Sequence, residues 1–300
     1  MHRYERILIT GAAGRLGSEL RRGLAPLART LRLAHRAPIG ALAPHEEEAV
    51  FDLADMEATI AATEGCDAIV HFGGAAVESP WQTILDANIR GSYHLYEGAR
   101  RHGVKRVVYA SSVHAIGYHE VDAHIPVDAP VRPDSLYGVS KCFVESLSRL
   151  YWDKFGIESV CLRIFSSFPE PADRRMLWSY LSFADCVRLV AASLTAPRVA
   201  HTISFGLSDN RVKTVDNRGA GHLGYIAKDS SEPFRAAVEA KTPTQNPTSP
   251  SAKYLGGWFC ELGHPTTRPA QADPAAGLAP GSAEISDCRG SRPSWSSTRL

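Results

Sequence analysis

Tyr137 and Lys141 lie four positions apart in the stretch SLYGVSKCF, residues 135–143. On a helix, positions i and i+4 share a face, so the phenol and the ammonium would face the same space. A phenol with a pKa of about 10 is a weak base at neutral pH, and a nearby ammonium favours its phenolate form. The pair therefore suits a general base and the cation that activates it. The same spacing is also common on solvated helix faces, so it needs support from elsewhere in the chain.

A glycine-rich stretch, TGAAGRLG, covers Thr10 to Gly17. Gly11 and Gly14 would keep a turn tight and let the backbone approach a pyrophosphate, and Gly17 would let the following helix pack closely. The phosphates would then meet the N–H groups at the N-terminus of that helix. A β-branched run precedes the stretch and a helical pattern follows it, which is the context that a dinucleotide site requires. The alternative is a glycine-rich turn without a ligand.

The elements that would position these residues alternate along the chain. Apolar runs predict strands over 6–10, 30–35, 48–53, 66–74, 105–112 and 158–164. Helical spacing predicts helices over 16–27, 56–65, 83–103 and 140–156. Such alternation is typical of βαβ units with a parallel sheet. We therefore predict an α/β fold with a Rossmann-type doubly wound parallel sheet and a small C-terminal substrate-binding portion.

The chain divides into three predicted parts. Residues 1–170 would form the dinucleotide-binding domain. Residues 171–263 would form the small substrate-binding portion packed on it, with a helix over 183–196, a strand over 201–206 and a helix over 231–241. Residues 264–300 are rich in Pro, Gly, Ser and Ala and poor in large apolar residues. Such a segment buries too little surface to offset the entropy of ordering it, so we predict a disordered tail.

Composition excludes several function classes. The chain has 300 residues, 44% of them hydrophobic and 22% charged, with a net charge of +1, which gives no support for a nucleic acid or an anionic membrane as partner. Its apolar runs are too short to span a bilayer, and a strand-like run begins too early to leave room for a signal peptide. The six cysteines show no zinc-ligand spacing, so we expect no metal site, reduced thiols and a cytoplasmic location.

Over about residues 5–240 the chain resembles the extended short-chain dehydrogenase/reductase superfamily, which combines G-x-x-G-x-x-G with Tyr-x-x-x-Lys. Several longer stretches resemble a narrower family, the bacterial uronate dehydrogenases. These stretches are ITGAAGRLG, DLAD, IVHFGGAAVESP, ASSVHAIGY, RPDSLYGVSKCF, YWDKFG, LRIFSSFPEP, RRML and DN at Asp216–Asn217.

The resemblance implies a catalytic group of Ser112, Tyr137 and Lys141. Tyr137 would take the proton of the C1 hydroxyl of a uronic acid (glucuronate or galacturonate), while hydride passes from C1 to the nicotinamide. The product would be an aldarolactone. Lys141 would also hold the nicotinamide ribose, and Ser112 would donate to the substrate oxygen. The neighbouring Ser111 is expected only to cap a turn.

The resemblance also implies NAD or NADP as cofactor. The expected binding residues are Gly11, Ala13, Gly14, Arg15, Leu16, Gly17, His35, Arg36, Asp52, Leu53, Phe72, Gly73, Gly74, Tyr137 and Lys141. An acidic residue at the end of the second strand normally binds the adenosine ribose and repels a 2′-phosphate. Here that position is His35, followed by Arg36, so we expect relaxed or NADP-leaning specificity. The alternative is that Arg36 faces solvent and NAD still binds.

Substrate contacts are implied for Arg175, Ser166 and His114. A guanidinium grips a carboxylate through two parallel hydrogen bonds, so Arg175 would clamp the group that distinguishes a uronate from a neutral sugar. Two expected substrate-binding positions depart from the family: Val113 replaces an asparagine and Ala76 replaces a serine. Each change removes a hydrogen-bonding group, which would weaken uronate binding or indicate a less polar substrate.

Three readings stay open at this stage. The first is a uronate dehydrogenase whose partners are a small sugar-acid substrate and other copies of its own chain. The second is a short-chain dehydrogenase acting on another sugar or hydroxy compound. The third is a dinucleotide-binding sensor without turnover, against which the presence of all three of Ser112, Tyr137 and Lys141 argues. An epimerase or dehydratase is a further option, but a dehydratase would usually carry acidic residues near the catalytic serine, and SSVHAIG has none.

Overall fold

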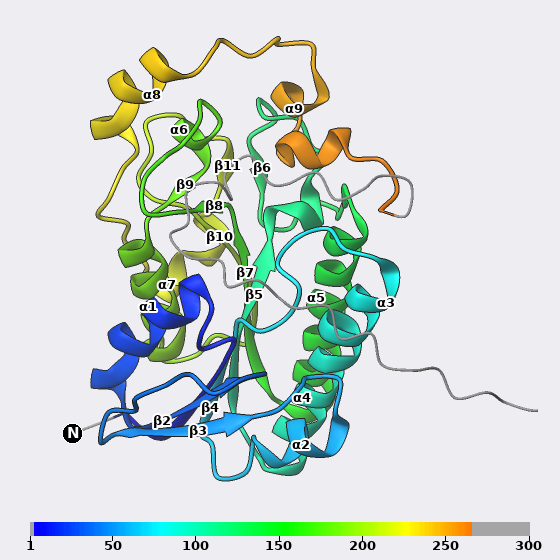
Figure 1. The fold of residues 1–300 in the computed structure, drawn as a ribbon, viewed down its shortest axis with the longest axis vertical. Coiled ribbons are helices and arrows are strands. Elements are labelled where there is room, and N and C mark those ends of the chain that lie inside the picture. Colours follow the sequence, from blue (N-terminus) through cyan, green and yellow to red (C-terminus); the bar gives the residue numbers. More distant parts are fainter. Residues whose placement is uncertain (1–2, 266–300) are drawn as a thin grey trace, which may run out of the picture. The chain divides into compact units, whose positions relative to one another are not determined.

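The computed structural model describes residues 3–265 and is built around a seven-stranded parallel sheet (Figure 1). The strand order is β10-β7-β5-β4-β1-β2-β3. The strands are β1 (Tyr4–Thr10), β2 (Ala28–His35), β3 (Glu46–Val50), β4 (Ala68–His71), β5 (Arg106–Ser112), β7 (Glu158–Ile164) and β10 (His201–Gly206). The chain winds in one direction from β1 to β3 and in the other from β4 to β10. The prediction of a doubly wound Rossmann-type sheet is confirmed, and its switch point lies between β1 and β4.

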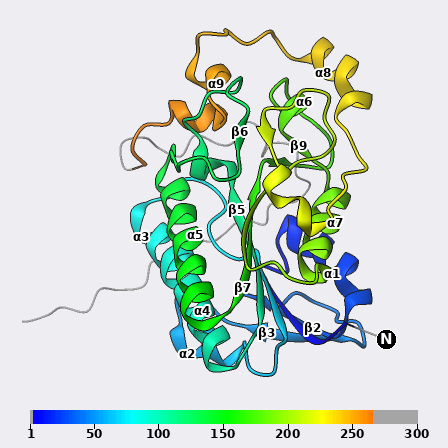
Figure 2. The same ribbon diagram turned by 180° about the vertical axis from the view of Figure 1, so that it is seen from behind.

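Helices cover both faces of the sheet (Figures 1 and 2). One face carries α1 (Arg15–Leu24) and α7 (Phe183–Thr195). The other carries α2 (Met56–Ala61), α4 (Gly91–Arg101) and α5 (Leu136–Phe155). Side chains alternate along each strand, so Ile7 and Ile9 pack under the first pair of helices and Leu8 under the second group.

The helix predicted over 83–103 is a longer helical stretch with a change of pitch. It consists of α3 (Trp81–Ile84), a π-helical segment (Leu85–Arg90) and α4. Helix α5 begins before its predicted start, because the Ser135 hydroxyl accepts a hydrogen bond from the N–H of Gly138 and caps the first turn. Tyr137 therefore lies in the first turn of α5, one turn before Lys141.

The chain after residue 170 contributes both to the sheet and to the layer above it. The predicted helix over 183–196 is α7, and the predicted strand over 201–206 is β10. The predicted helix over 231–241 consists of a 3₁₀ turn followed by the shorter helix α8 (Arg235–Lys241). Small elements complete this part: β6 (Ile125–Pro126), β8 (Ser166–Ser167), β9 (Tyr180–Leu181), β11 (Val215–Asp216), α6 (Met176–Ser179) and α9 (Pro250–Lys253). The 3₁₀ turns are Ala25–Leu27, Val113–Ile116, Arg218–Leu223, Glu232–Phe234 and Gly257–Glu261.

The predicted boundary at residue 170 stays a prediction. So does the disordered tail over 264–300, since residues 266–300 lie outside the described part. Between residues 3 and 265, no helix is long and apolar enough to cross a membrane. The same residues contain no group of three or more His, Cys, Asp or Glu side chains that would hold a metal ion. Their five cysteines are unpaired.

Candidate active site

The structure brings Ser112, Tyr137 and Lys141 together where β5 ends against the first turns of α5. The Lys141 ammonium donates a hydrogen bond of 2.7 Å to the carbonyl of Ala110. Its Nζ lies 5.1 Å from the centre of the Tyr137 ring. The Ser112 hydroxyl forms a hydrogen bond with the Tyr137 phenol. All three side chains are buried.

Burial sets the charge state of this group. It raises the pKa of Tyr137 to about 12, an effect that the hydrogen bond with Ser112 opposes. It also lowers the pKa of Lys141 to about 7, against the attraction of the Glu145 carboxylate. Desolvation favours the neutral form of both groups. A base at Tyr137 therefore needs added positive charge beside the phenol, which the protonated Lys141 and an oxidised nicotinamide would supply.

The expectation that Ser111 only caps a turn is wrong. The Ser111 hydroxyl donates a hydrogen bond of 2.6 Å to the Glu145 carboxylate on α5. The capping role belongs to Ser112, whose hydroxyl accepts from the N–H of His114 and starts the 3₁₀ turn after β5. Successive strand side chains point to opposite faces, so Ser111 meets the helix while Ser112, at the strand end, bonds the following turn.

The glycine-rich stretch forms a cradle that side chains would fill. Gly11 has a φ of +70°, and a Cβ there would lie 2.6 Å from the carbonyl oxygen of Phe72. A Cβ on Gly17 would lie 2.0 Å from the carbonyl oxygen of Gly11. Helix α1 follows with no side-chain cap and no acidic residue in its first turn. Its N–H groups are therefore open to an anion, and these features fit the pyrophosphate of a dinucleotide.

The other predicted cofactor residues border this cradle at the ends of neighbouring strands. The Gly73 N–H donates to the Thr10 hydroxyl over 3.0 Å, and Thr10 is bonded in turn to His71 over 2.7 Å. These bonds tie the end of β4 to the end of β1. Ala13, Arg15 and Gly74 are exposed, and Leu16, Leu53 and Phe72 are half-buried. Asp52 is exposed, and its carboxylate accepts from the N–H of Ala54.

The end of β2 lacks the acidic residue that would favour NAD over NADP, and the cation Arg36 follows it. His35 is the last residue of β2, and the carbonyl of the preceding Ala34 accepts from the N–H of Ala12 in the glycine cradle. Burial and the neighbouring Arg36 lower the pKa of His35, so the imidazole is neutral at neutral pH. Arg36 is exposed and forms no ion pair with any of residues 3–265. A guanidinium thus stands beside the adenosine end of the predicted site.

Arg175 lies just before α6 and has no ion-pair partner among the carboxylates of the described residues. It donates to the Ser166 hydroxyl over 2.8 Å and to the carbonyl of Leu255, and its guanidinium lies 5.1 Å from the Trp178 ring centre. Within the described part of the chain, its buried Nε atom finds no hydrogen-bond partner. Desolvation lowers the pKa of Arg175, which shows that the cation has lost much of its hydration.

His114 lies beside Tyr137 and is held on two sides. Its Nδ1 atom is 2.7 Å from the Asp134 carboxylate, whose side chain is fully buried. Its ring stacks on Phe259 with a centroid distance of 3.7 Å and meets the Tyr137 ring edge-on at 5.7 Å. Because Nδ1 faces the carboxylate, the other ring nitrogen is the one left for a ligand.

The two departures from the family pattern differ in their surroundings. Val113 is 2% exposed and packs in an apolar cluster with Ile116, Phe165 and Leu255. Ala76 is exposed in the loop after β4. Neither side chain offers a hydrogen bond, so the site is less polar at both positions than the resemblance implies.

Sequence reasoning missed the segment that covers this site from the C-terminal side. Leu255 accepts from Arg175, and a Cβ on Gly257 would lie 2.6 Å from the Nε atom of Arg175. A Cβ on Gly256 would lie 1.9 Å from the Asp134 carboxylate. Phe259 follows and stacks on His114. The GG pair before an aromatic residue was the available signal, but only the fold shows what it touches.

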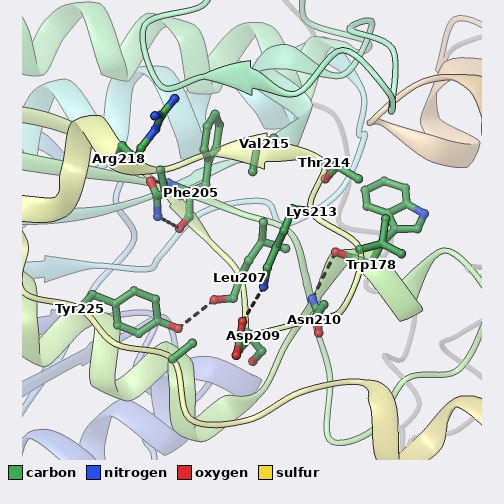
Figure 3. Close-up of a pocket in the computed structure, with 14 residues that line it drawn as sticks. Trp178, Phe205, Leu207, Asp209, Asn210, Lys213, Thr214, Val215, Arg218 and Tyr225 are labelled. Atoms are coloured by element: carbon green, nitrogen blue, oxygen red, sulfur yellow. Dashed lines mark hydrogen bonds and ion pairs between the residues drawn. The ribbon is translucent and has the colours of Figure 1, made fainter.

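A separate cavity of about 410 Å³ lies near the C-terminal end of β10 (Figure 3). Aromatic rings of Trp178, Phe205 and Tyr225 line it, together with the Asp209–Lys213 ion pair. Ser112, Tyr137, Lys141 and Arg175 are not among its lining residues. It is therefore distinct from the catalytic group, and Trp178, whose ring centre lies 5.1 Å from the Arg175 guanidinium, is one link between the two.

Comparison with known proteins shows the family to which the chain belongs. Residues 7–194 match the NAD dependent epimerase/dehydratase family. The chain is 51% identical over 261 residues to a uronate dehydrogenase of Pseudomonas putida, covering 87% of this chain and 97% of that protein.

Solved structures give the same relationship. A glucuronic acid dehydrogenase from Chromohalobacter salexigens superposes with a TM-score of 0.87 at 44% identity, covering 88% of this chain and all of the other. A mutant uronate dehydrogenase from Agrobacterium tumefaciens in complex with NAD superposes with a TM-score of 0.84 at 45% identity, covering 86% and 98%. The chain therefore belongs to the uronate dehydrogenases, within the NAD dependent epimerase/dehydratase family.

Proposed function

We propose that the protein oxidises C1 of a uronic acid to an aldarolactone with a nicotinamide dinucleotide as hydride acceptor. The observation that carries this proposal is Arg175, a partly buried guanidinium that pairs with no carboxylate of residues 3–265. It bonds Leu255, on the segment whose Phe259 packs against His114 and Tyr137. A partly buried cation that lacks a carboxylate partner is costly, so a site of this kind favours a ligand with a carboxylate.

Each group has one task in the proposed reaction. Tyr137 accepts the proton of the C1 hydroxyl, and Ser112 donates a hydrogen bond to that oxygen as negative charge develops on it. Lys141 supplies positive charge near the phenol. When bound, the nicotinamide accepts the hydride that leaves C1. The C1–O bond becomes the lactone carbonyl, so the two electrons and the proton are both accounted for.

Arg175, Ser166 and His114 would orient the sugar acid. Arg175 and Ser166 already form a hydrogen-bonded pair, which places a hydroxyl next to the guanidinium. Asp134 fixes the ring of His114 beside Tyr137. Val113 and Ala76 offer no such bonds, and this observation supports a second candidate, the oxidation of a less polar sugar by the same group. A sensor without turnover is disfavoured, since nucleotide binding alone needs no Ser, Tyr and Lys group.

NAD is the cofactor that the relatives support, and we propose that this chain also accepts NADP. The repulsive acid at the end of β2 is absent, and the exposed Arg36 is available to pair with a 2′-phosphate.

We further propose that the enzyme works in the cytoplasm as a homo-oligomer. Large apolar side chains are exposed on α5 and on the neighbouring α4: Phe143 is 38% exposed, Val139 42%, Leu150 44% and Tyr93 42%. A second copy of the chain would bury such a face.

Replacing Tyr137 by Phe should abolish turnover and spare cofactor binding, because only the phenol oxygen is lost. The rate should fall by about 10² to 10⁴, the usual contribution of a positioned base. Steady-state kinetics and calorimetric titration with NAD measure the two effects. A variant that keeps more than about a tenth of the wild-type kcat would refute the assignment.

Replacing Arg175 by Lys should raise the KM for glucuronate far more than that for glucose, because a point charge cannot reproduce a bidentate grip. Arg174→Lys is the matched control, since within residues 3–265 Arg174 bonds only the backbone carbonyls of Thr242 and Glu239. Equal effects of Arg175→Lys on both substrates, or equal effects of the two variants, would indicate a structural role.

Replacing His35 by Asp should move the cofactor preference toward NAD by about tenfold or more, because a carboxylate repels the 2′-phosphate. The wild type should prefer NAD by less than about a hundredfold, and Arg36→Ser should lower kcat/KM for NADP alone. The measurement is kcat/KM with each cofactor. An unchanged ratio in His35→Asp would contradict the proposal.

Replacing Phe143 by Arg should shift the protein to a smaller assembly, because it places a charge in the face that a second copy would bury. Light scattering after size-exclusion chromatography measures this, with Ile226→Arg, at an exposed position outside that face, as control. A wild-type monomer would disprove the oligomer.

A further inference from the structure

A buried ion pair lies directly behind the candidate catalytic group, and the proposed reaction does not use it. Arg163 on β7 grips Glu145 on α5 through two hydrogen bonds, of 2.9 Å and 3.0 Å. The two side chains are 2% and 5% exposed. Desolvation makes such a pair a poor source of stability compared with apolar residues of the same size. Stability therefore does not explain why an ion pair is buried at this position.

Glu145 joins the two elements that carry the reacting groups. It lies one turn after Lys141 on α5. Its carboxylate accepts the Ser111 hydroxyl over 2.6 Å, and Ser111 directly precedes Ser112. Lys141 itself bonds the carbonyl of Ala110 over 2.7 Å. The last three residues of β5, Ala110 to Ser112, thus all take part in the site. Ala110 and Ser111 are hydrogen-bonded to successive turns of α5.

Glu145 is also the anion that acts on Lys141. Groups on every neighbouring element face the ammonium: His71 on β4, Tyr109 on β5, Cys161 on β7, and Tyr137 and Glu145 on α5. Burial lowers the pKa of His71 to about 3 and raises that of Cys161 and Tyr137 to about 12. It raises the pKa of Tyr109 as well. Near neutral pH all four are uncharged, which leaves Glu145, paired with Arg163, as the charged group of this described set.

We propose that Glu145 is a positioning residue for hydride transfer. It holds the strand end with Ser112 at a fixed distance from Tyr137 and Lys141, and its negative charge favours the ammonium form of Lys141. This inference rests on the proposed function of those three residues.

The direction of its effect on pH dependence follows from the charges. Burial lowers the pKa of Lys141 to about 7, and Glu145 opposes that fall. Without the carboxylate, Lys141 loses its proton at a lower pH. With an oxidised nicotinamide bound, whose charge would favour the phenolate, Tyr137 then lacks its second stabilising cation and needs a higher pH to ionise. The acid limb of the rate profile should therefore move to higher pH.

The test compares Glu145→Gln with Glu158→Gln as matched control. Glu158 also forms an ion pair within the sheet, with Arg106, but at the opposite end of β7. The amide oxygen introduced by Glu145→Gln would still accept from Ser111, so the geometry is largely kept. We expect the acid limb of kcat/KM for glucuronate to move up by about half a pH unit or more in Glu145→Gln only. Ser111→Ala should lower kcat without moving the limb.

Two further measurements keep the outcome decisive. If Glu145→Gln fails to fold because Arg163 is left uncompensated, the double variant Glu145→Gln with Arg163→Met removes both charges and should show the same shift. An NMR titration of the Lys141 ammonium, with Lys141→Met used to assign its signal, needs no substrate. It should show a lower pKa for Lys141 in Glu145→Gln than in the wild type.

Unchanged profiles, or the same loss at every pH in Glu145→Gln and Glu158→Gln, would overturn the inference. A wild type that oxidises no uronate would overturn the proposed function instead, and the Lys141 titration would still decide the role of Glu145.

Discussion

The spacing between the end of β5 and helix α5 is the constraint on which the candidate site depends. Ser112 is the last residue of the strand, whereas Tyr137 and Lys141 are one turn apart at the start of the helix. Two hydrogen bonds, Lys141 to the Ala110 carbonyl and Ser111 to the Glu145 carboxylate, hold the end of β5 against α5. A displacement of the reacting groups by about 1 Å can lower the rate by two powers of ten. The hydrogen bonds between β5 and α5 therefore affect the rate more than their contribution to stability indicates.

Burial is the second constraint, because it removes water from polar side chains at the site and so favours their interaction with charged ligands. It keeps Tyr137 and Lys141 close to their neutral forms, and it strips water from Arg175. A substrate carboxylate beside Arg175 would offset the hydration that this cation has lost. Positive charge beside Tyr137 would favour the phenolate, which burial disfavours. The site is thus complementary to the charges of a sugar acid and an oxidised nicotinamide.

The local patterns of the sequence predicted the sheet, the glycine cradle and the pairing of Tyr137 with Lys141, since each depends on residues close in the chain. Contacts between distant residues escaped prediction. Nothing in the chain order indicates that Phe259 stacks on His114 or that Leu255 bonds Arg175. The role of Ser111 was misjudged for the same reason, because its partner Glu145 is a helix residue far along the chain.

The most direct test of the central claim is to follow the hydrogen on C1. Glucuronate carrying deuterium at C1 is incubated with the protein and NAD, and both products are analysed by mass spectrometry. The account predicts deuterated NADH together with an aldarolactone that has lost the label. Deuterium retained on the sugar, or reduced cofactor without the label, would show that the bond broken is not the one that this site is built to break.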